Sequence, residues 1–208
     1  MSALPAEFTD RWENRAEPRP GEGLVYWHLL MGSHPEVVAL AREAQQRLAR
    51  FTGLHMTPLK WLHTTVLIAG DAGQIPSADL ERMAAAAGRL LSGAAPVTVT
   101  LGKVLYHPEA IMLAVNPPGA LDPVLDAARA ATREVTGGDG RSGHQSPWRP
   151  HITVCYSTSR QPAAPIISSV GRELPGAAIR LRDVSLVIQR GPERLWDWHP
   201  AATIRFGG

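Results

Sequence analysis

Residues 62–69 read LHTTVLIA, and residues 150–157 read PHITVCYS. Each stretch contains a histidine, any residue, a threonine and an apolar residue, and β-branched residues of this kind favour strands. Side chains two residues apart lie on the same face of a strand, so His63 shares a face with Thr65, and His151 shares one with Thr153. The sequence therefore predicts two strands that each present an imidazole and a hydroxyl side by side.

The same alternation predicts on which face of the strand the residues after each motif lie. It places Cys155 on the polar face, where we interpret it as a small buried residue, and it turns Ile68 and Tyr156 toward the apolar core. Burying an imidazole and a hydroxyl in an apolar core would leave polar groups without partners. Two strands of this type are more stable when their polar faces line a solvent-filled cleft.

Paired histidines suit the cleavage of a phosphodiester. One group must take a proton from the nucleophile and a second must give a proton to the leaving oxygen, and histidine has a pKa near neutrality. Threonine hydroxyls two residues further on can donate hydrogen bonds to the non-bridging oxygens. We therefore predict that His63, Thr65, His151 and Thr153 are catalytic, and that neither a metal ion nor another cofactor is needed.

A third match, His55-Met56-Thr57, precedes Pro58 in a stretch that indicates a loop, and we set it aside. A metal hydrolase that uses His63 and His151 with further ligands is an alternative. The chain lacks the closely spaced histidines that are typical of zinc sites, so we rank this alternative lower.

Composition sets broad limits on the class of protein. Of the 208 residues 44% are hydrophobic, and 21 Lys and Arg oppose 19 Asp and Glu, a net charge of +2. That charge gives no support for nucleic-acid binding through bulk electrostatics. With one cysteine, a polar N-terminus and no long apolar run, we expect a soluble cytoplasmic protein without a membrane segment, a monomer with no obligate protein partner.

Periodicity and turn residues predict an alternating order of strands and helices. Residues 1–22 form an N-terminal tail, either mobile or laid as a strap over the surface, and residues 23–208 form a single domain. The loop at 136–150 is rich in Gly, Ser and Pro and is a candidate lid that carries Arg141 and His144. Strands are expected at 24–30, 62–69, 97–105, 111–115, 151–157, 179–188 and 195–206, and helices at 35–50, 78–91, 121–135 and 166–173.

The pair His63-Thr64-Thr65-Val66 and His151-Ile152-Thr153-Val154 resembles the motifs of the 2H phosphoesterase superfamily, in its 2′-5′ RNA ligase-like branch. The resemblance implies an α+β fold with two pseudo-symmetric lobes. Each lobe would be an antiparallel sheet with helices on its outer face, and strands would line a central cleft. Spacing of the two motifs by close to half of the chain is consistent with such a duplication.

The resemblance also implies a reaction. It is the cleavage, or the reverse ligation, of 2′,3′-cyclic or 2′,5′-linked phosphodiesters at an RNA terminus or in a nucleotide, with His63 and His151 as the acid and base. Members that act on RNA ends usually carry an arginine shortly after the second motif, where this chain has Cys155, Tyr156 and Ser157. This difference leaves the substrate open. A non-catalytic nucleotide- or RNA-binding module of the same fold is the main alternative.

Candidate substrate-binding residues lie next to the motifs and on the first strand. Cations there could attract a phosphate and aromatic rings could stack on a base, although surface charge and packing explain such residues equally well. Trp196, Trp198 and His199 are expected to pack in the core or a hairpin. The candidate substrate-binding residues are Lys60, Trp61, Trp148, Arg149, Tyr26 and His28.

Overall fold

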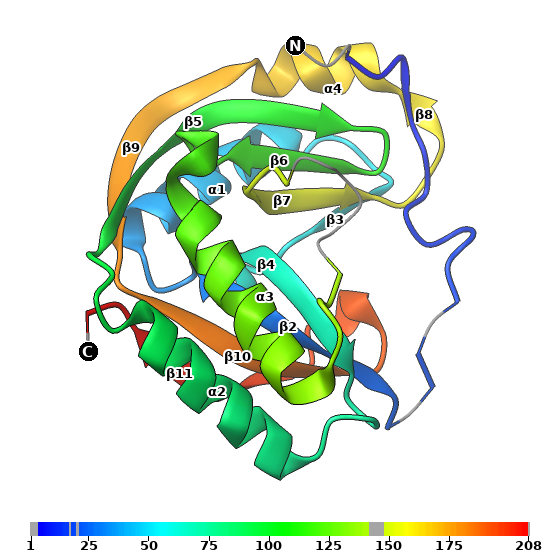
Figure 1. The fold of residues 1–208 in the computed structure, drawn as a ribbon. Helices are drawn as coiled ribbons and strands as arrows, with labels where there is room; N and C mark the ends of the chain where they lie inside the picture. The colour runs from blue at the N-terminus through cyan, green and yellow to red at the C-terminus, as the bar shows by residue number, and fades with distance from the viewer. Residues whose placement is uncertain (1–3, 17, 20, 142–147, 208) are drawn as a thin grey trace.

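The computed structural model describes residues 4–16, 18, 19, 21–141 and 148–207, and it contains two main antiparallel sheets (Figure 1). The four-stranded sheet has the order β11-β10-β2-β4, and the five-stranded sheet has the order β3-β7-β6-β5-β9. The strands are β2 (Gly23–Leu30), β3 (Leu54–Met56), β4 (His63–Asp71), β5 (Val97–His107), β6 (Ala110–Ala114), β7 (His151–Ser157), β9 (Glu173–Leu181), β10 (Asp183–Arg190) and β11 (Trp198–Arg205).

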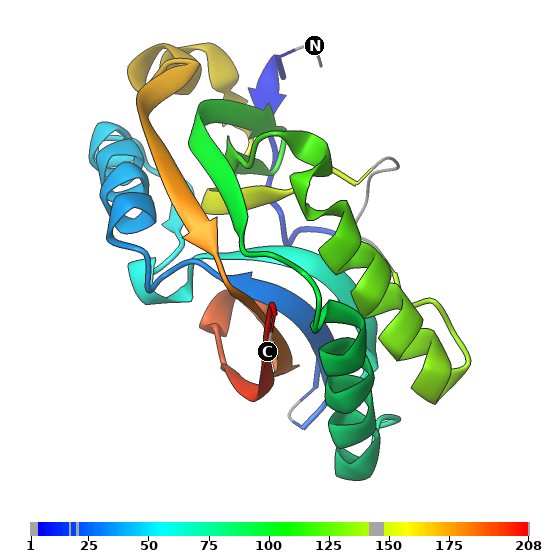
Figure 2. The same ribbon diagram turned by 60° about the vertical axis from the view of Figure 1, so that its left-hand side comes forward.

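Helices cover the sheets from outside, as Figure 2 shows, with α1 on one side of the molecule and α2 and α3 on the other. Helix α1 (Pro35–Leu48) contacts β7 and β9 of the five-stranded sheet, although it follows β2 of the other sheet. Conversely, α3 (Asp122–Thr136) joins β6 to β7 yet contacts β4, and α2 (Ser77–Leu91) packs on α3 and β11. The two halves therefore exchange helices, which confirms the expected α+β fold with two lobes.

Helix α1 illustrates why the sequence forms these elements. Pro35 occupies the first turn, where its missing N–H costs no hydrogen bond, and the helix ends two residues before the expected Arg50. The buried positions recur every three or four residues, as one apolar face requires. They are Val37, Leu40, Ala41, Ala44 and Leu48.

Strand β7 contains a bulge directly after its motif. Cys155 pairs with Ile111 and Thr153 pairs with Met112, so Val154 is an extra residue with no partner of its own. The bulge reverses the alternation. As a result, Cys155 lies in the apolar core, and Tyr156 lies on the same side as Thr153. Tyr156 is buried, as expected, but it lies on the opposite side from the one predicted, because simple alternation does not foresee a bulge.

Strand β4 contains the same bulge at the corresponding place. Leu67 pairs with Trp27 and Thr65 pairs with His28, so Val66 is the extra residue. Leu67 is fully buried while Ile68 is only half-buried. The expected side for Ile68 was therefore wrong for the same reason. A shared bulge after both motifs is independent structural support for the duplication.

Other differences from the expected elements concern boundaries and short strands. The strand expected at 179–188 is two strands, because the chain leaves one sheet at Leu181 and enters the other at Asp183. Helix α4 (Ala163–Val170) ends at Val170, before the expected Glu173. His55 lies in β3, which pairs with β7, and not in a loop. The remaining elements are β1 (Glu7–Phe8), β8 (Gln161–Pro162), η1 (Leu59–Trp61), η2 (Pro118–Leu121) and η3 (Glu193–Leu195).

The N-terminal segment forms a strap across the molecule. Strand β1 pairs with β8, and Phe8 is completely buried in the core. Beyond it, the backbone N–H of Arg11 donates to the carbonyl of Ser157 at 3.0 Å. Of the two alternatives, a mobile tail and a strap, the structure has the strap. Within the described residues no helix is both long and apolar enough to cross a bilayer.

Candidate active site

The two motif histidines are held in the same way. The Nδ1 atom of His63 lies 2.7 Å from the carbonyl oxygen of Trp61, and that of His151 lies 2.8 Å from the carbonyl oxygen of Arg149. A carbonyl only accepts, so in each ring Nδ1–H is the donor. This bond fixes the tautomer and leaves Nε2 as the nitrogen that can accept a proton.

The two motifs meet between the lobes. Strands β4 and β7 contact each other, and the indole N–H of Trp148 donates to the carbonyl of Thr65 at 3.2 Å. Burial lowers the pKa of both His63 and His151, and a positive charge on His151 lowers that of His63 further. Both imidazoles therefore lie partly buried on neighbouring strands of the two sheets.

Aromatic rings surround His63. Its ring centroid lies 4.3 Å from that of His28, 5.7 Å from Trp198 and 6.2 Å from Trp196. Trp196 and Trp198 are buried, as expected for packing residues, while His199 is exposed. This apolar wall disfavours a charged imidazole, which explains the lowered pKa of His63.

His28 is placed behind His63 and not in the cleft. It is 1% exposed, so it cannot contact a ligand directly, which corrects the expectation that it binds substrate. Burial, and then the charge of His63, hold the pKa of His28 well below its ordinary value. Tyr26 stacks on His28 with ring centroids 4.9 Å apart and is itself half-buried.

Tyr156 joins the second motif to its surroundings. Its side chain lies on the same face of β7 as Thr153, and burial is the main reason that its pKa is raised to about 12. The guanidinium carbon of Arg11 lies 4.5 Å from the centre of the Tyr156 ring. Sequence reasoning missed both residues: a bulge moved Tyr156, and Arg11 lies in a segment without periodicity.

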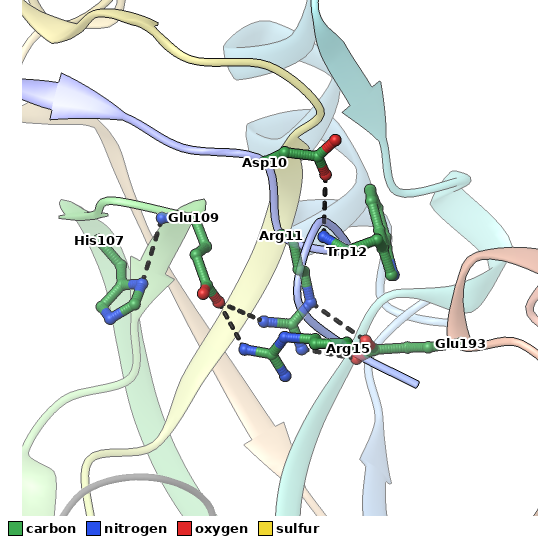
Figure 3. A network of polar contacts seen from close by, with 7 residues as sticks. All are labelled: Asp10, Arg11, Trp12, Arg15, His107, Glu109 and Glu193. Atoms are coloured by element: carbon green, nitrogen blue, oxygen red, sulfur yellow. Dashed lines mark hydrogen bonds and ion pairs between the residues drawn. The ribbon is translucent and has the colours of Figure 1, made fainter. Parts of the chain in front are cut away.

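A polar network surrounds Arg11 (Figure 3). Its Nε and Nη2 atoms donate to Glu193 at 3.1 and 2.9 Å, and Nη1 donates to Glu109 at 3.2 Å. Arg15 donates to the same carboxylate of Glu109 at 2.6 Å. Nothing in the sequence pattern indicated these acidic residues, because neither is near a motif.

An open groove of about 700 Å³ adjoins the second motif. Ala114 lines it and pairs with His151, so the groove begins beside the strand of the second motif. Trp148 and Arg149, two of the expected substrate-binding residues, line it, and Lys103, which sequence reasoning missed, lines it from β5. Arg129, Asn116, Asp122 and Asp126 complete its polar lining.

The remaining expected residues lie elsewhere. Lys60 is exposed, and its ammonium group lies 5.0 Å from the ring centre of Trp61, which in turn contacts Trp198 with centroids 4.6 Å apart. Cys155 is buried, and burial raises its pKa to about 12. Arg141 pairs through its backbone with Ile68, and His144 lies outside the described residues. In the described part of the chain no three His, Cys, Asp or Glu side chains gather as metal ligands.

Comparison with known proteins supports the architecture. Among solved structures, TT0787 of Thermus thermophilus is similar with a TM-score of 0.66 and 20% identity, over 89% of this chain and 98% of that one. E. coli LigT complexed with ATP has a TM-score of 0.61 and 13% identity, over 90% and 99% of the two chains. LigT complexed with 3′-AMP gives 0.57 and 14%, over 93% and 100%. At these identities the likeness concerns the fold.

A sequence search of curated proteins gives no match. The profile of the 2′-5′ RNA ligase superfamily, however, matches residues 34–193, which include both motifs and most of the two sheets. The resemblance drawn from the two His-x-Thr motifs is thereby confirmed. The chain belongs to the 2′-5′ RNA ligase superfamily.

Proposed function

We propose that the protein is a phosphodiesterase that opens 2′,3′-cyclic phosphates or cleaves 2′,5′-linked phosphodiesters at an RNA terminus or in a small nucleotide. The observation that carries this proposal is the matched Nδ1 bond of His63 and His151, which leaves two Nε2 atoms for proton transfer. One imidazole takes a proton from water as it attacks phosphorus, and the other protonates the leaving oxygen. The same pair acts in the reverse direction during ligation.

Hydroxyl groups stabilise the negative charge on the phosphate. Thr65 and Thr153 share a face with their histidines and are partly exposed, so they can donate to the non-bridging oxygens. Protons and charge are then both handled by side chains of the two motifs. We therefore expect activity to persist in the presence of a strong chelator.

The rest of the substrate occupies the groove beside His151. Its volume of about 700 Å³ is of the size that small ligands fill, and the cations Arg149 and Lys103 favour an anion there. Trp148 supplies an aromatic surface next to them. E. coli LigT was crystallised with nucleotides including 3′-AMP, which supports a ligand of this class.

The test is a panel of 2′,3′-cyclic nucleotides and 2′,5′-linked dinucleotides assayed in chelator, with products separated by 2′ or 3′ position. His63→Ala and His151→Ala should each reduce turnover by at least about 10²-fold, because each removes one proton-transfer group. His199→Ala, on an exposed position of β11, is the matched control and should retain full activity.

Ligand binding separates the enzyme from a binding module. Both histidine variants should still bind the product nucleotide, since the groove is untouched. If the wild-type protein binds nucleotide but consumes nothing in the panel, the non-catalytic module is the correct description and the proposed reaction is wrong.

A further inference from the structure

Arg11 connects the two lobes through a single guanidinium group. Glu109 lies in the turn between β5 and β6 of the five-stranded sheet, and Glu193 lies in η3 between β10 and β11 of the four-stranded sheet. Arg11 bonds both carboxylates from the strap, which belongs to neither sheet (Figure 3). Its side chain is only 14% exposed. An ion pair this well covered is less screened by solvent than an ordinary surface pair.

The guanidinium group of Arg11 is also connected to the second motif through Tyr156. Arg11 lies over the ring of Tyr156, and Tyr156 lies beside Thr153 on the same face of β7. The neighbouring Trp12 contacts the Tyr156 ring edge-on, with ring centroids 5.6 Å apart. A continuous series of contacts therefore runs from the strap to a hydroxyl that the proposed reaction uses.

We propose that Arg11 is a positioning residue of the active site, which fixes the spacing of the lobes through Glu109 and Glu193 and holds Thr153 in place through Tyr156. This inference rests on the proposed function. Arginine suits the task because its planar fork bonds two carboxylates at once while its face stacks on a ring, which lysine cannot do.

The charges of this network affect the pKa values of His63 and His151 in opposite directions. His151 faces Arg11 of the strap and His107 of β5, and after burial both lower its pKa. His63 faces Glu193, whose negative charge raises its pKa against the lowering effects of burial and His151. His28 is the other titratable group packed on His63.

The experiment compares Arg11→Met, Arg11→Lys and the control Arg15→Met, which removes the other strap cation on Glu109. In Arg11→Met we expect kcat to fall by about 10- to 100-fold with KM little changed, since small misplacements of catalytic groups have effects of this size. The pH at which His151 titrates should rise, both in the profile of kcat/KM and in histidine NMR of the free protein. Arg15→Met should change neither.

Arg11→Lys separates position from charge. It keeps the positive charge, so the titration of His151 should stay close to wild type, while kcat should still fall because one ammonium cannot hold both carboxylates and the ring. If Arg11→Met does not fold, as judged by circular dichroism, Arg11→Lys decides alone. Wild-type kcat in that variant would overturn the proposal.

The NMR titration keeps this inference distinct from the proposed function. A wild-type protein that is inactive on the whole panel refutes the proposed reaction. The titration of His151 in Arg11→Met would then still report whether the charge of Arg11 acts on His151. An unmoved titration in a folded Arg11→Met protein refutes the role of Arg11, whatever the activity.

Discussion

Thr64 and Thr65 are adjacent residues of β4 with opposite environments. Thr65 lies partly exposed on the face of His63, whereas Thr64 is fully buried, and its hydroxyl has no hydrogen-bond partner in the described structure. A buried hydroxyl without a partner lowers the free energy of unfolding, because it loses its hydration without replacement. Replacement of each threonine by valine is therefore expected to have opposite results at the two positions.

Thr65→Val should reduce kcat by about 10²-fold or more, the effect of losing one hydrogen-bond donor to a developing charge, and leave stability unchanged. Thr64→Val should retain activity and raise the free energy of unfolding by about 1 kcal/mol. Steady-state kinetics and urea unfolding of both variants measure these effects. A loss of activity in Thr64→Val with none in Thr65→Val would mean that the two faces have been assigned the wrong way round.

At this scale the sequence predicted correctly that each motif histidine shares a face with the threonine two residues on, because the pattern itself specifies this. Prediction failed where a backbone irregularity intervened, as with Tyr156, whose side depends on a bulge that only pairing with β6 reveals. It also failed for Arg11, whose partners Glu109 and Glu193 are distant along the chain. Contacts of that kind carry no local signal.

The strands and helices likewise divide into those that the sequence predicted and those that it missed. The four longest helices and most strands were predicted because their buried positions repeat with a period of two or of three to four residues. The strands β1, β3 and β8 are too short to show a period, and each forms only because a partner edge is available. The passage from β9 to β10 was missed because a single residue, Arg182, separates the two strands.

One side chain of the strap, Phe8, reaches into the main hydrophobic core. Phe8 is completely buried, while Leu4, near the start of the described chain, is 41% exposed. Phe8→Ala should lower the free energy of unfolding by about 3 kcal/mol, through lost burial and the cavity left behind. Leu4→Ala is the matched control and should have an effect below about 0.5 kcal/mol. Urea unfolding measures both.

Detachment of the strap should also be visible by proteolysis, since a released segment exposes its backbone. In Phe8→Ala we expect cleavage within residues 4–16 under conditions that leave the wild type intact. Equal stability of the Phe8→Ala and Leu4→Ala proteins would show that the strap is not anchored through this ring.

The molecule as a whole is two similar halves that cannot separate. Each motif strand has the same bulge, each motif histidine has the same Nδ1 bond, and α1 and α3 each pack on the sheet of the other half. An exchange of this kind keeps the two halves together without a large interface of its own. It also fixes the two imidazoles relative to each other through the shared core.

Burying histidines at this junction makes the stability of the whole molecule depend on pH. The pKa of His28, His63 and His151 is lowered chiefly by burial, whereas in the unfolded chain each titrates near 6.5. Below about pH 6.5 the unfolded state thus binds more protons than the folded state, so the free energy of unfolding falls as the pH falls. The loss reaches at most about 1.4 kcal/mol per pH unit for each histidine, and it is absent above that window.

Urea unfolding of wild type, His28→Phe and His199→Ala between pH 8 and pH 5 tests this dependence. His28→Phe keeps a ring against Tyr26 and His63 but removes the most strongly shifted group, so its stability should decline less steeply. His199 is exposed, and its replacement should leave the slope of the wild type unchanged. If the slopes of wild type and His28→Phe coincide, His28 is not buried in its neutral form, and the lowered pKa values around His63 lose their structural explanation.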